Sequence, residues 1–262
     1  PHRFWLVDGA SANRVSIEDD DTVHLMVSAW DAATGVAVPA ASPSVTVTSG
    51  GSPVAARTLW RMLSQNMGFH YGDNVTLDGA GDYEVTVEFG PVGARRTGAF
   101  RDAFGDVATA TVPLSFSEST LQEVPYRELG RAGLEGAVDP MESMTVPQVP
   151  AADALPGAAL GSGSVGDASL VGRRLAESPA GVGGSDPYLA VSARTPYNRY
   201  PLPFAALSAT VDGAAVSLTP TLDPELHYHY GATVPGLTAD ASVSVRVDTP
   251  PQVSRHEGYE TA

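Results

Sequence analysis

Apolar and polar residues alternate with a period of two in several short segments of the chain. In YEVTVEF, residues 83–89, the apolar side chains would all lie on one face of an extended strand, and ASVSVRV, residues 241–247, repeats the pattern. Turn-forming segments such as DGAGD, residues 78–82, and VDG, residues 211–213, separate strands of this kind. The pattern predicts an all-β protein made of antiparallel sandwiches.

The middle of the chain lacks this alternation. Residues 119–133 (STLQEVPYRELGRAG) favour a short helix that Ser117 or Ser119 caps and Pro125 interrupts. The stretch that follows is rich in Pro, Ala, Gly and Ser, which is typical of a connector between domains. With 262 residues the chain is long enough for two domains. We predict a first domain over residues 1–132, a connector over 133–165 and a second domain over 166–262.

Short sequence words recur in the same order in both halves of the chain, which indicates an internal repeat. Leu-Val precedes Val-Ser-Ala, and His-Tyr-Gly comes later, before a turn and an alternating strand. The words stand at Leu6-Val7, 27–29 and 70–72 in the first half, and at Leu170-Val171, 191–193 and 229–231 in the second. We therefore predict two tandem copies of one β-sandwich, with Leu6-Val7 and Leu170-Val171 in equivalent strands.

The charge of the chain limits its partners. A formal net charge of −15 argues against binding to nucleic acid, whose phosphates require clustered basic residues. Every basic residue is Arg, there is no Lys, and Ile17 is the only isoleucine. This composition resembles that of proteins from extreme halophiles, where surface carboxylates keep a protein hydrated in brine. The acidity therefore indicates habitat first, and a cationic ligand only second.

Few catalytic patterns are present. The chain has no cysteine, so disulfides, thiolate metal sites and a Cys nucleophile are excluded. It also has no Gly-rich phosphate loop and no GxSxG segment, and the DPEL segment at 223–226 is expected to form a turn. We therefore do not expect an enzyme.

Candidate metal ligands lie on two predicted strands of the first half. In TVHLMVSAW, residues 22–30, His24 and Met26 are two residues apart and so share one face of a strand. Met67 and His70 approach from a second strand, in SQNMGFHYGDNVTL. Imidazole suits Cu, Zn, Ni and Fe, and thioether sulfur adds a preference for Cu(I). We predict that these four side chains bind one transition metal.

The alternative is a structural role for the same residues. Histidines of strands commonly make structural hydrogen bonds, and methionine commonly fills gaps in a core. In that interpretation His70 and His229 fix equivalent turns, while Met26 and Met62 are core residues.

The phrase MGFHYGDNV, together with HLM upstream, resembles the periplasmic iron-transport family. These proteins are immunoglobulin-like sandwiches that bind Cu and Fe and serve ferrous-iron uptake beside a membrane iron permease. The chain keeps the family's motif at His24, Gly68, His70, Tyr71, Gly72 and Asn74. It departs from it at Met26 and Met67, where the family has carboxylates, and at Leu63, where the family has a Met. A further family histidine has no counterpart, because Arg95 and Arg96 stand in that region.

The second copy departs further from the motif. Tyr188 stands at the position of His24, and Ala190 at the position of Met26. His227 and His229 share a face of an extended strand, which gives a two-imidazole clamp as an alternative second site. Such a clamp lacks the three or four ligands of a tight site, and His256 with Glu257 are candidates to complete it.

The remaining candidate ligands carry weaker expectations. Met141, Glu142 and Met144 lie near the connector and are expected to belong to a solvated linker, with transfer of soft metal ions as the alternative. His2 lies near the start of the chain and is expected to be inert.

The resemblance implies a metal-binding protein of an iron-uptake system, with copper or iron as its ion, a membrane iron permease as its partner and homodimers as a compatible state. The alternative is a structural or adhesive surface protein, including a polymer-forming one, that uses the sandwich as a building block. No apolar run reaches the roughly 20 residues of a membrane helix. We expect an exported, lipid-anchored protein on the surface of a halophilic archaeon, with its targeting segment outside the sequence shown.

Overall fold

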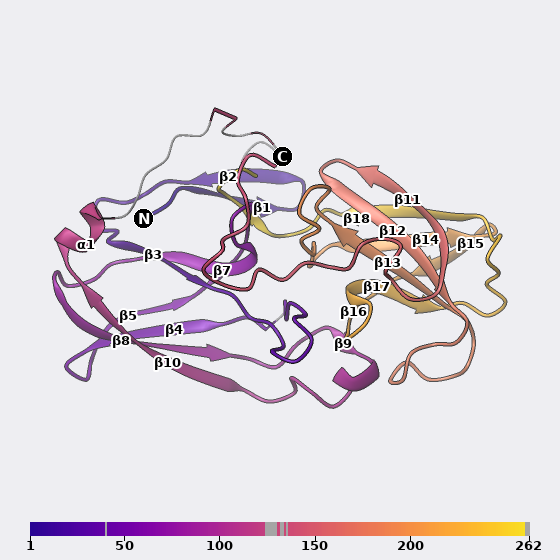
Figure 1. Cartoon of the computed structure of the whole chain (residues 1–262), viewed down its shortest axis with the longest axis horizontal. Coiled ribbons are helices and arrows are strands. Elements are labelled where there is room, and N and C mark those ends of the chain that lie inside the picture. The colour runs from indigo at the N-terminus through magenta and orange to yellow at the C-terminus, as the bar shows by residue number, and fades with distance from the viewer. Residues whose placement is uncertain (40, 124–129, 132–133, 135, 260–262) are drawn as a thin grey trace.

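The structure is a computed structural model that describes residues 1–39, 41–123, 130–131, 134 and 136–259. It is built almost entirely of β-strands, which form two sandwiches side by side along the long axis of the molecule (Figure 1). The predicted all-β class and the two β-sandwiches are confirmed.

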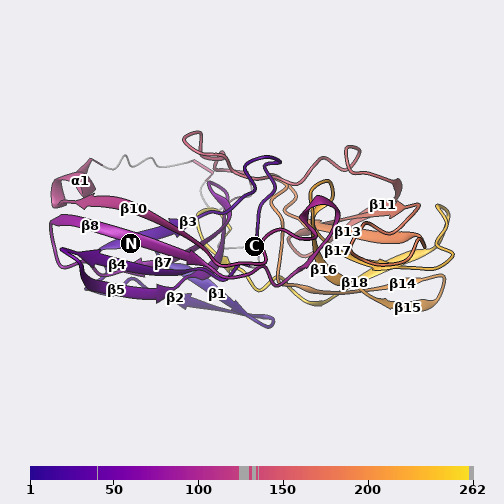
Figure 2. The same cartoon turned by 90° about the horizontal axis from the view of Figure 1, so that it is seen from below.

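The first sandwich packs a six-stranded sheet on a four-stranded sheet, and Figure 2 looks onto the four-stranded sheet with the other sheet behind it. The six-stranded sheet has the order β2-β1-β19-β6-β7-β3 and the other has the order β10-β8-β4-β5. The strands of the first sheet are β1 (Phe4–Asp8), β2 (Ser11–Val15), β3 (Val23–Val27), β6 (Trp60–Ser64), β7 (Gly68–Val75) and β19 (Ser254–Arg255). Those of the second are β4 (Ser44–Ser49), β5 (Ser52–Thr58), β8 (Gly81–Phe89) and β10 (Ala108–Phe116).

The second sandwich packs a six-stranded sheet of order β11-β12-β13-β17-β16-β9 on a three-stranded sheet of order β15-β14-β18. The strands of the larger sheet are β9 (Arg95–Arg96), β11 (Ala158–Val165), β12 (Ala168–Leu175), β13 (Tyr188–Arg194), β16 (Thr219–Asp223) and β17 (His227–Thr233). Those of the smaller sheet are β14 (Ala206–Val211), β15 (Ala214–Ser217) and β18 (Val243–Thr249).

Two short strands are exchanged between the sandwiches. β19 comes after the last strand of the second sandwich, yet it runs parallel to β6 of the first, with Ser254 opposite Met62. β9 comes after β8 of the first sandwich and runs parallel to β16 of the second, with Arg95 opposite Thr221. Each sandwich is therefore completed by a strand from the other repeat.

The pairing registers define which positions of the two repeats correspond. His24 lies opposite Asn74 and Met26 opposite Gly72, while Tyr188 lies opposite Thr233 and Ala190 opposite Gly231. Met62 pairs with His70 as Thr221 pairs with His229. The Val-Ser-Ala and His-Tyr-Gly words are thus equivalent in structure, and Tyr188 and Ala190 do stand at the positions of His24 and Met26.

The Leu-Val words are not equivalent, and that expectation was wrong. Leu6 and Val7 lie in β1, whose sheet neighbours are β2 and β19, whereas Leu170 and Val171 lie in β12, between β11 and β13. The two hairpins therefore join opposite sides of their sheets. Short apolar dipeptides recur in any β-protein, so the Leu-Val dipeptide does not identify equivalent strands.

The connector is shorter than the predicted range of 133–165. Strand β11 occupies 158–165 and pairs along its length with β12. Its Gly and Ser residues look like linker, but they form an exposed outer strand whose backbone supplies the pairing. Before the connector, helix α1 (Glu118–Gln122) begins after Ser117, whose Oγ accepts the Thr120 N–H (3.2 Å) as a helix cap. The rest of the predicted helix lies largely outside the described residues.

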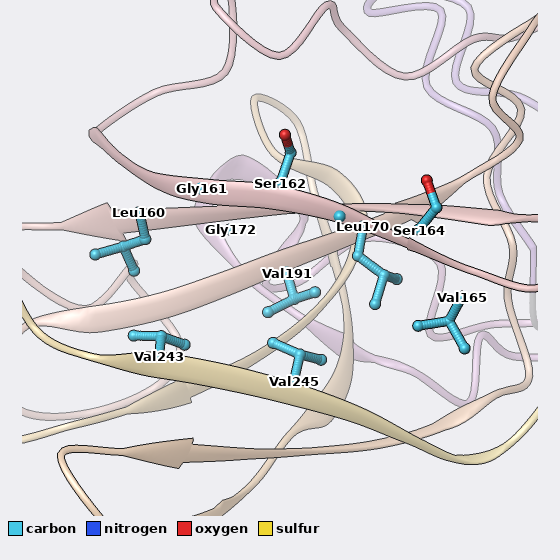
Figure 3. A pocket seen from close by; sticks show the side chains of 11 residues that line it. Leu160, Gly161, Ser162, Ser164, Val165, Leu170, Gly172, Val191, Val243 and Val245 are labelled. Atoms are coloured by element: carbon cyan, nitrogen blue, oxygen red, sulfur yellow. The ribbon is translucent and has the colours of Figure 1, made fainter.

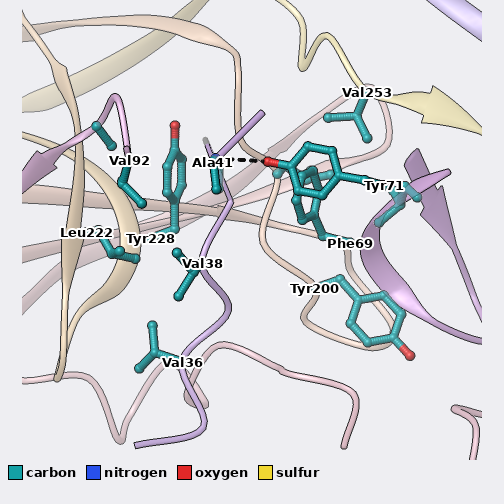
Figure 4. Close-up of a cluster of buried hydrophobic side chains, with 14 of the residues drawn as sticks. Val36, Val38, Ala41, Phe69, Tyr71, Val92, Tyr200, Leu222, Tyr228 and Val253 are labelled. Atoms are coloured by element: carbon teal, nitrogen blue, oxygen red, sulfur yellow. Dashed lines mark hydrogen bonds between the residues drawn. The ribbon is translucent and has the colours of Figure 1, made fainter. Parts of the chain in front are cut away.

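The two sandwiches share one hydrophobic core. Figure 4 shows Phe69 and Tyr71 of the first repeat near Val253, and Val38 near Tyr228 of the second. Tyr71 Oη accepts the Ala41 N–H (3.1 Å), and Tyr230 Oη accepts the Ala205 N–H (2.9 Å) at the corresponding place. The tyrosine of each His-Tyr-Gly word therefore fixes a loop at the centre of the molecule.

The far end of the second sandwich is less completely filled. A hollow of about 410 Å³ lies between β11, β12 and β13 on one side and β18 on the other. Val191 and Leu170 meet Val243 and Val245 across it (Figure 3), and the glycines of β11 add no side chain to fill it. Among the described residues, no helix is both long and apolar enough to cross a membrane.

Candidate metal centre

Four of the six histidines meet on the face of the six-stranded sheet that points away from the shared core. His24 comes from β3, His70 from β7, His256 follows β19, and His2 precedes β1. The ring centroids of His70 and His256 are 4.9 Å apart, those of His24 and His256 5.6 Å, and those of His2 and His24 5.0 Å. His24 and His70 therefore both lie beside His256, and His2 lies next to His24.

Strand alternation explains this placement. His70 alternates with Phe69 and Tyr71, whose side chains enter the shared core, so the imidazole of His70 must point to the opposite face. Asn74 lies on the same face of β7 as His70, and His24 stands opposite Asn74 in the neighbouring strand β3. His256 is brought in because its backbone N–H donates to the Leu63 carbonyl (3.2 Å) next to β6.

Asn74 fixes the protonation of His24. The Asn74 side-chain amide donates to the His2 carbonyl (2.9 Å), and its Oδ1 accepts the His2 backbone N–H (3.0 Å). Oδ1 also lies 2.8 Å from His24 Nδ1, so Nδ1 must carry the hydrogen and donate it. The lone pair of His24 is therefore on Nε2, which is buried and has no hydrogen-bond partner among the described residues. This is the state of a metal-binding imidazole held by an outer hydrogen bond.

His70 is held in the same tautomer. Its Nδ1–H donates to the Gly68 carbonyl (3.0 Å), which leaves the lone pair on Nε2. His256 Nε2 lies 2.9 Å from this atom and donates its hydrogen to it. His70 and His256 are both essentially inaccessible to solvent, at 0% and 1% exposure. The Nε2 lone pair of His70 is thus taken up by His256, while that of His24, beside the same ring, has no partner among the described residues.

Met62 borders the same space. Its side chain is fully buried, and its Sδ lies 3.1 Å from the point where a Cβ on Gly72 would stand. His24 Nε2 lies 3.1 Å from that same point. Gly72 does not have a positive φ, so its role is to leave this space open, whereas Gly68 with φ +67 supplies the turn geometry.

A more exposed group of ligands lies on the other side of His256. One ligand atom each of His2, His256 and Glu257 lie within 4.8 Å of one another, and His2 Nδ1 is 3.6 Å from the Glu257 carboxylate. The cluster therefore offers imidazole, thioether and carboxylate donors around His256. The expectation that His2 is inert finds no support in this position.

Burial keeps His24, His70 and His256 neutral. Desolvation lowers the pKa of His24 and of His70 from 6.5 to about 4. It also lowers the pKa of His256 to about 2, with further contributions from His70, His24 and His2. Neutral imidazole is the form that binds metal. The ligands are therefore available at any pH above about 5.

The two methionines predicted as ligands lie less favourably than Met62. Met26 shares the face of His24 and stands opposite Gly72, in the outermost strand of the sheet, where it is only partly buried. Met67 lies in the turn between β6 and β7, where its backbone N–H donates to Ser64 Oγ (3.0 Å). Neither sulfur has a described contact with the histidines. Met141 is tied to the same turn by its backbone N–H, which donates to the Asn66 carbonyl (2.8 Å).

In the second repeat the corresponding residues surround an arginine. His229 Nδ1–H donates to the His227 carbonyl (3.0 Å), as His70 does to Gly68, and Tyr188 Oη lies 3.1 Å from His229 Nε2. Arg95 Nη2 donates to Tyr188 Oη (2.8 Å), to Thr221 Oγ1 (2.9 Å) and to the Gly231 carbonyl (2.9 Å). His256 and Glu257, considered above as ligands for this repeat, lie in the other sandwich.

The expected clamp of His227 and His229 assumed an extended backbone at both residues. His227 has φ +57, the left-handed conformation that Gly68 has in the first repeat, so it leaves the strand alternation. Its neighbours are Gln148, Arg194 and Asp223, whereas those of His229 are Tyr188, Arg95 and the same Asp223. The two imidazoles therefore share only Asp223 among these neighbours.

Sequence reasoning missed His2, Met62 and His256 as members of the cluster. Their positions depend on the exchanged strand β19 and on the β1 strand that pairs with it, neither of which local patterns reveal. One signal was available in the sequence. His256 follows the second His-Tyr-Gly word by the same interval at which Thr97 follows the first, so the two residues occupy equivalent positions of the repeats.

The chain belongs to the family described as "Domain of unknown function (DUF7350)", whose model matches residues 4–113 and 153–262. The two matched segments agree with the two repeats of the structure. No curated protein matches the chain at a significant level. No solved structure does so either.

Proposed function

We propose that the first repeat binds one transition-metal ion through His24, His70 and His256, with Met62 beside them. The observation that carries this proposal is the buried Nε2 lone pair of His24, which lacks a partner and is oriented by Asn74. Burying an acceptor without a partner costs on the order of 1–3 kcal/mol. A metal ion at this point recovers that cost.

The pair of His70 and His256 requires only a small adjustment to hold an ion. Metal ions sit about 2.0–2.1 Å from imidazole nitrogens, and tetrahedral coordination holds two such nitrogens about 3.4 Å apart. His70 and His256 Nε2 are 2.9 Å apart, so the rings separate by about 0.5 Å on binding. His256 also gives up the hydrogen that it donates to His70, so binding releases a proton or moves it to His256 Nδ1.

Copper is the metal we propose, with iron as the competing ion. Copper lies at the top of the affinity order for nitrogen ligands, and thioether sulfur favours Cu(I). Met62 supplies the thioether sulfur that we had predicted from Met26 and Met67. Glu257 supplies the carboxylate that Fe(II) would need, and its place at the more exposed side of the cluster suits an ion that enters or leaves there.

The wider role we propose is metal handling in iron uptake outside the cytoplasmic membrane. The resemblance of the His24 and His70 segments to the periplasmic iron-transport family supports this role, and implies a membrane iron permease as partner. The Lys-free, acidic composition supports a halophilic archaeon as the source. A lipid anchor at the cell surface is part of the same proposal and follows from the family resemblance.

Metal titration tests the proposal. Purified protein is titrated with Cu(I), Cu(II), Fe(II) and Zn(II), alongside His24→Ala, His70→Ala and His256→Ala, with His229→Ala as the matched control in the second repeat. We expect one ion per chain in the parent and the control, and at least a tenfold loss of affinity in each of the three variants. If all five proteins bind equally, and the variants lose only stability, the cluster is structural and the chain is a surface building block.

A further inference from the structure

The second repeat holds a guanidinium among the residues that correspond to the histidine cluster of the first. Arg95 contacts Tyr188 and Thr221, which correspond by strand register to His24 and Met62. Its third partner, the Gly231 carbonyl, belongs to the residue that corresponds to Gly72. The position of Arg95 itself corresponds to Ser254, whose side chain is too short to reach the equivalent space.

The position that corresponds to His256 has also changed. Thr97 corresponds to His256, because the Thr97 N–H donates to the Leu222 carbonyl (3.0 Å) as the His256 N–H donates to Leu63. Thr97 Oγ1 donates to Asp223 Oδ2 (2.7 Å) and makes no approach to His229 of the kind that His256 makes to His70. Only His229 remains of the imidazole ligands, and it keeps the same Nδ1 hydrogen bond to the carbonyl two residues earlier.

We infer that the second repeat is a cation site whose permanent occupant is Arg95, so that the chain binds a single metal ion. An exchanged strand completes each site: His256 of the first site follows β19, and Arg95 of the second lies in β9. A guanidinium in this place supplies a positive charge and several N–H donors in one plane. It satisfies the Tyr188 hydroxyl, whose own hydrogen is donated to His229 Nε2. A metal ion would have to displace both the charge and these hydrogen bonds.

Two rebuilt chains test this inference. Both carry His24→Gln, His70→Gln and His256→Gln, which remove the imidazoles of the first site and break the group of His2, His256 and Glu257, so the result does not depend on the proposed function. Both also carry Tyr188→His, Thr221→Met and Thr97→His, which give the second repeat the ligands of the first. One keeps Arg95 and the other carries Arg95→Ser, the residue found at the corresponding position 254.

The probe is Zn(II), which is redox-inert and binds imidazole, measured by equilibrium dialysis and elemental analysis. We expect no bound zinc in the chain that keeps Arg95 and one ion per chain with Arg95→Ser. That ion should be lost when His229→Gln is added. Equal binding by both chains overturns the inference, as does a folded Arg95→Ser chain that binds none.

Folding of the rebuilt chains is followed by circular dichroism, because loss of the Arg95 hydrogen bonds destabilises the sheet. If the Arg95→Ser chain is unfolded without metal, it is titrated with Zn(II). Recovery of the β-sheet signal on zinc addition supports the inference, and absence of recovery contradicts it. Two zinc ions per unmodified chain, one of them lost in His229→Gln, would also contradict it.

Discussion

Gly72→Ala is the most informative single perturbation of the metal centre. The added Cβ would lie 3.0 Å from the Leu25 carbonyl oxygen and 3.1 Å from both His24 Nε2 and Met62 Sδ. These distances are several tenths of an ångström shorter than ordinary contacts, so the three groups must move apart. Overpacking of this kind costs about 1–3 kcal/mol, and no backbone strain is added because φ at Gly72 is not positive. We expect a free energy of unfolding about 1–2 kcal/mol lower in metal-free protein.

The effect on metal binding should be larger than the effect on folding. The methyl group displaces His24 and Met62 at the point where they approach each other, and displaced ligands typically cost about 10–100-fold in metal affinity. The assay is competition for Cu(I) against a chelator, with urea unfolding measured on the same samples. Gly231→Ala is the matched control, because its Cβ would clash with the Tyr188 side chain at the corresponding position of the second repeat. It should lose more stability than Gly72→Ala and keep its metal affinity. Unchanged affinity in Gly72→Ala would refute the location of the ion between His24 and Met62.

Three further predictions concern the residues around the cluster. Asn74→Leu removes the acceptor for the His24 Nδ1–H, so copper affinity should fall about 10–100-fold. Asn74→Asp keeps an acceptor and should retain most of the copper affinity. Metal-free protein should lose stability as the pH falls from 6.5 to about 4, because burial lowers the pKa of His24 and His70 to about 4 and the unfolded chain takes up protons that they do not. Urea unfolding at several pH values should show the free energy of unfolding falling by about 1.4 kcal/mol per pH unit for each of these histidines. Tyr71→Phe and Tyr230→Phe each leave a loop N–H without its acceptor, so each should lower the free energy of unfolding by about 1–3 kcal/mol and leave metal affinity unchanged.

The pH prediction also replaces a simpler expectation from sequence. Unperturbed histidines would release a metal as the pH falls through about 6.5. Burial lowers the pKa of His24 and His70 to about 4, so the bound state should persist to about pH 5. Sequence alone gives no measure of how deeply a histidine is buried, and therefore could not place this midpoint.

The period-two alternation and the repeated His-Tyr-Gly words were sufficient to predict two sandwiches and the equivalence of His70 with His229. Both signals are local, because strand period and turn chemistry are set by neighbouring residues. The same alternation placed His24 and His70 on a common face. Met26 was placed on that face correctly, but it is only partly buried and has no described contact with the histidines.

The exchanged strands account for most of what the sequence did not reveal. Each is only two residues long, at 95–96 and 254–255, and pairs with a strand more than a hundred positions away in the chain. No periodicity can be read from two residues. His256 therefore seemed to belong to the second repeat, and Arg95 seemed only to mark a missing histidine.

The location of the ion is the most direct test of the metal centre. Crystals grown with copper would be measured at energies on either side of the copper absorption edge, and an anomalous difference map calculated. We expect one strong peak per chain within bonding distance of Nε2 of His24 and of His70, close to His256, and none beside Arg95. A map without a peak there, or with its strongest peak at His227 or His229, would contradict the proposed centre.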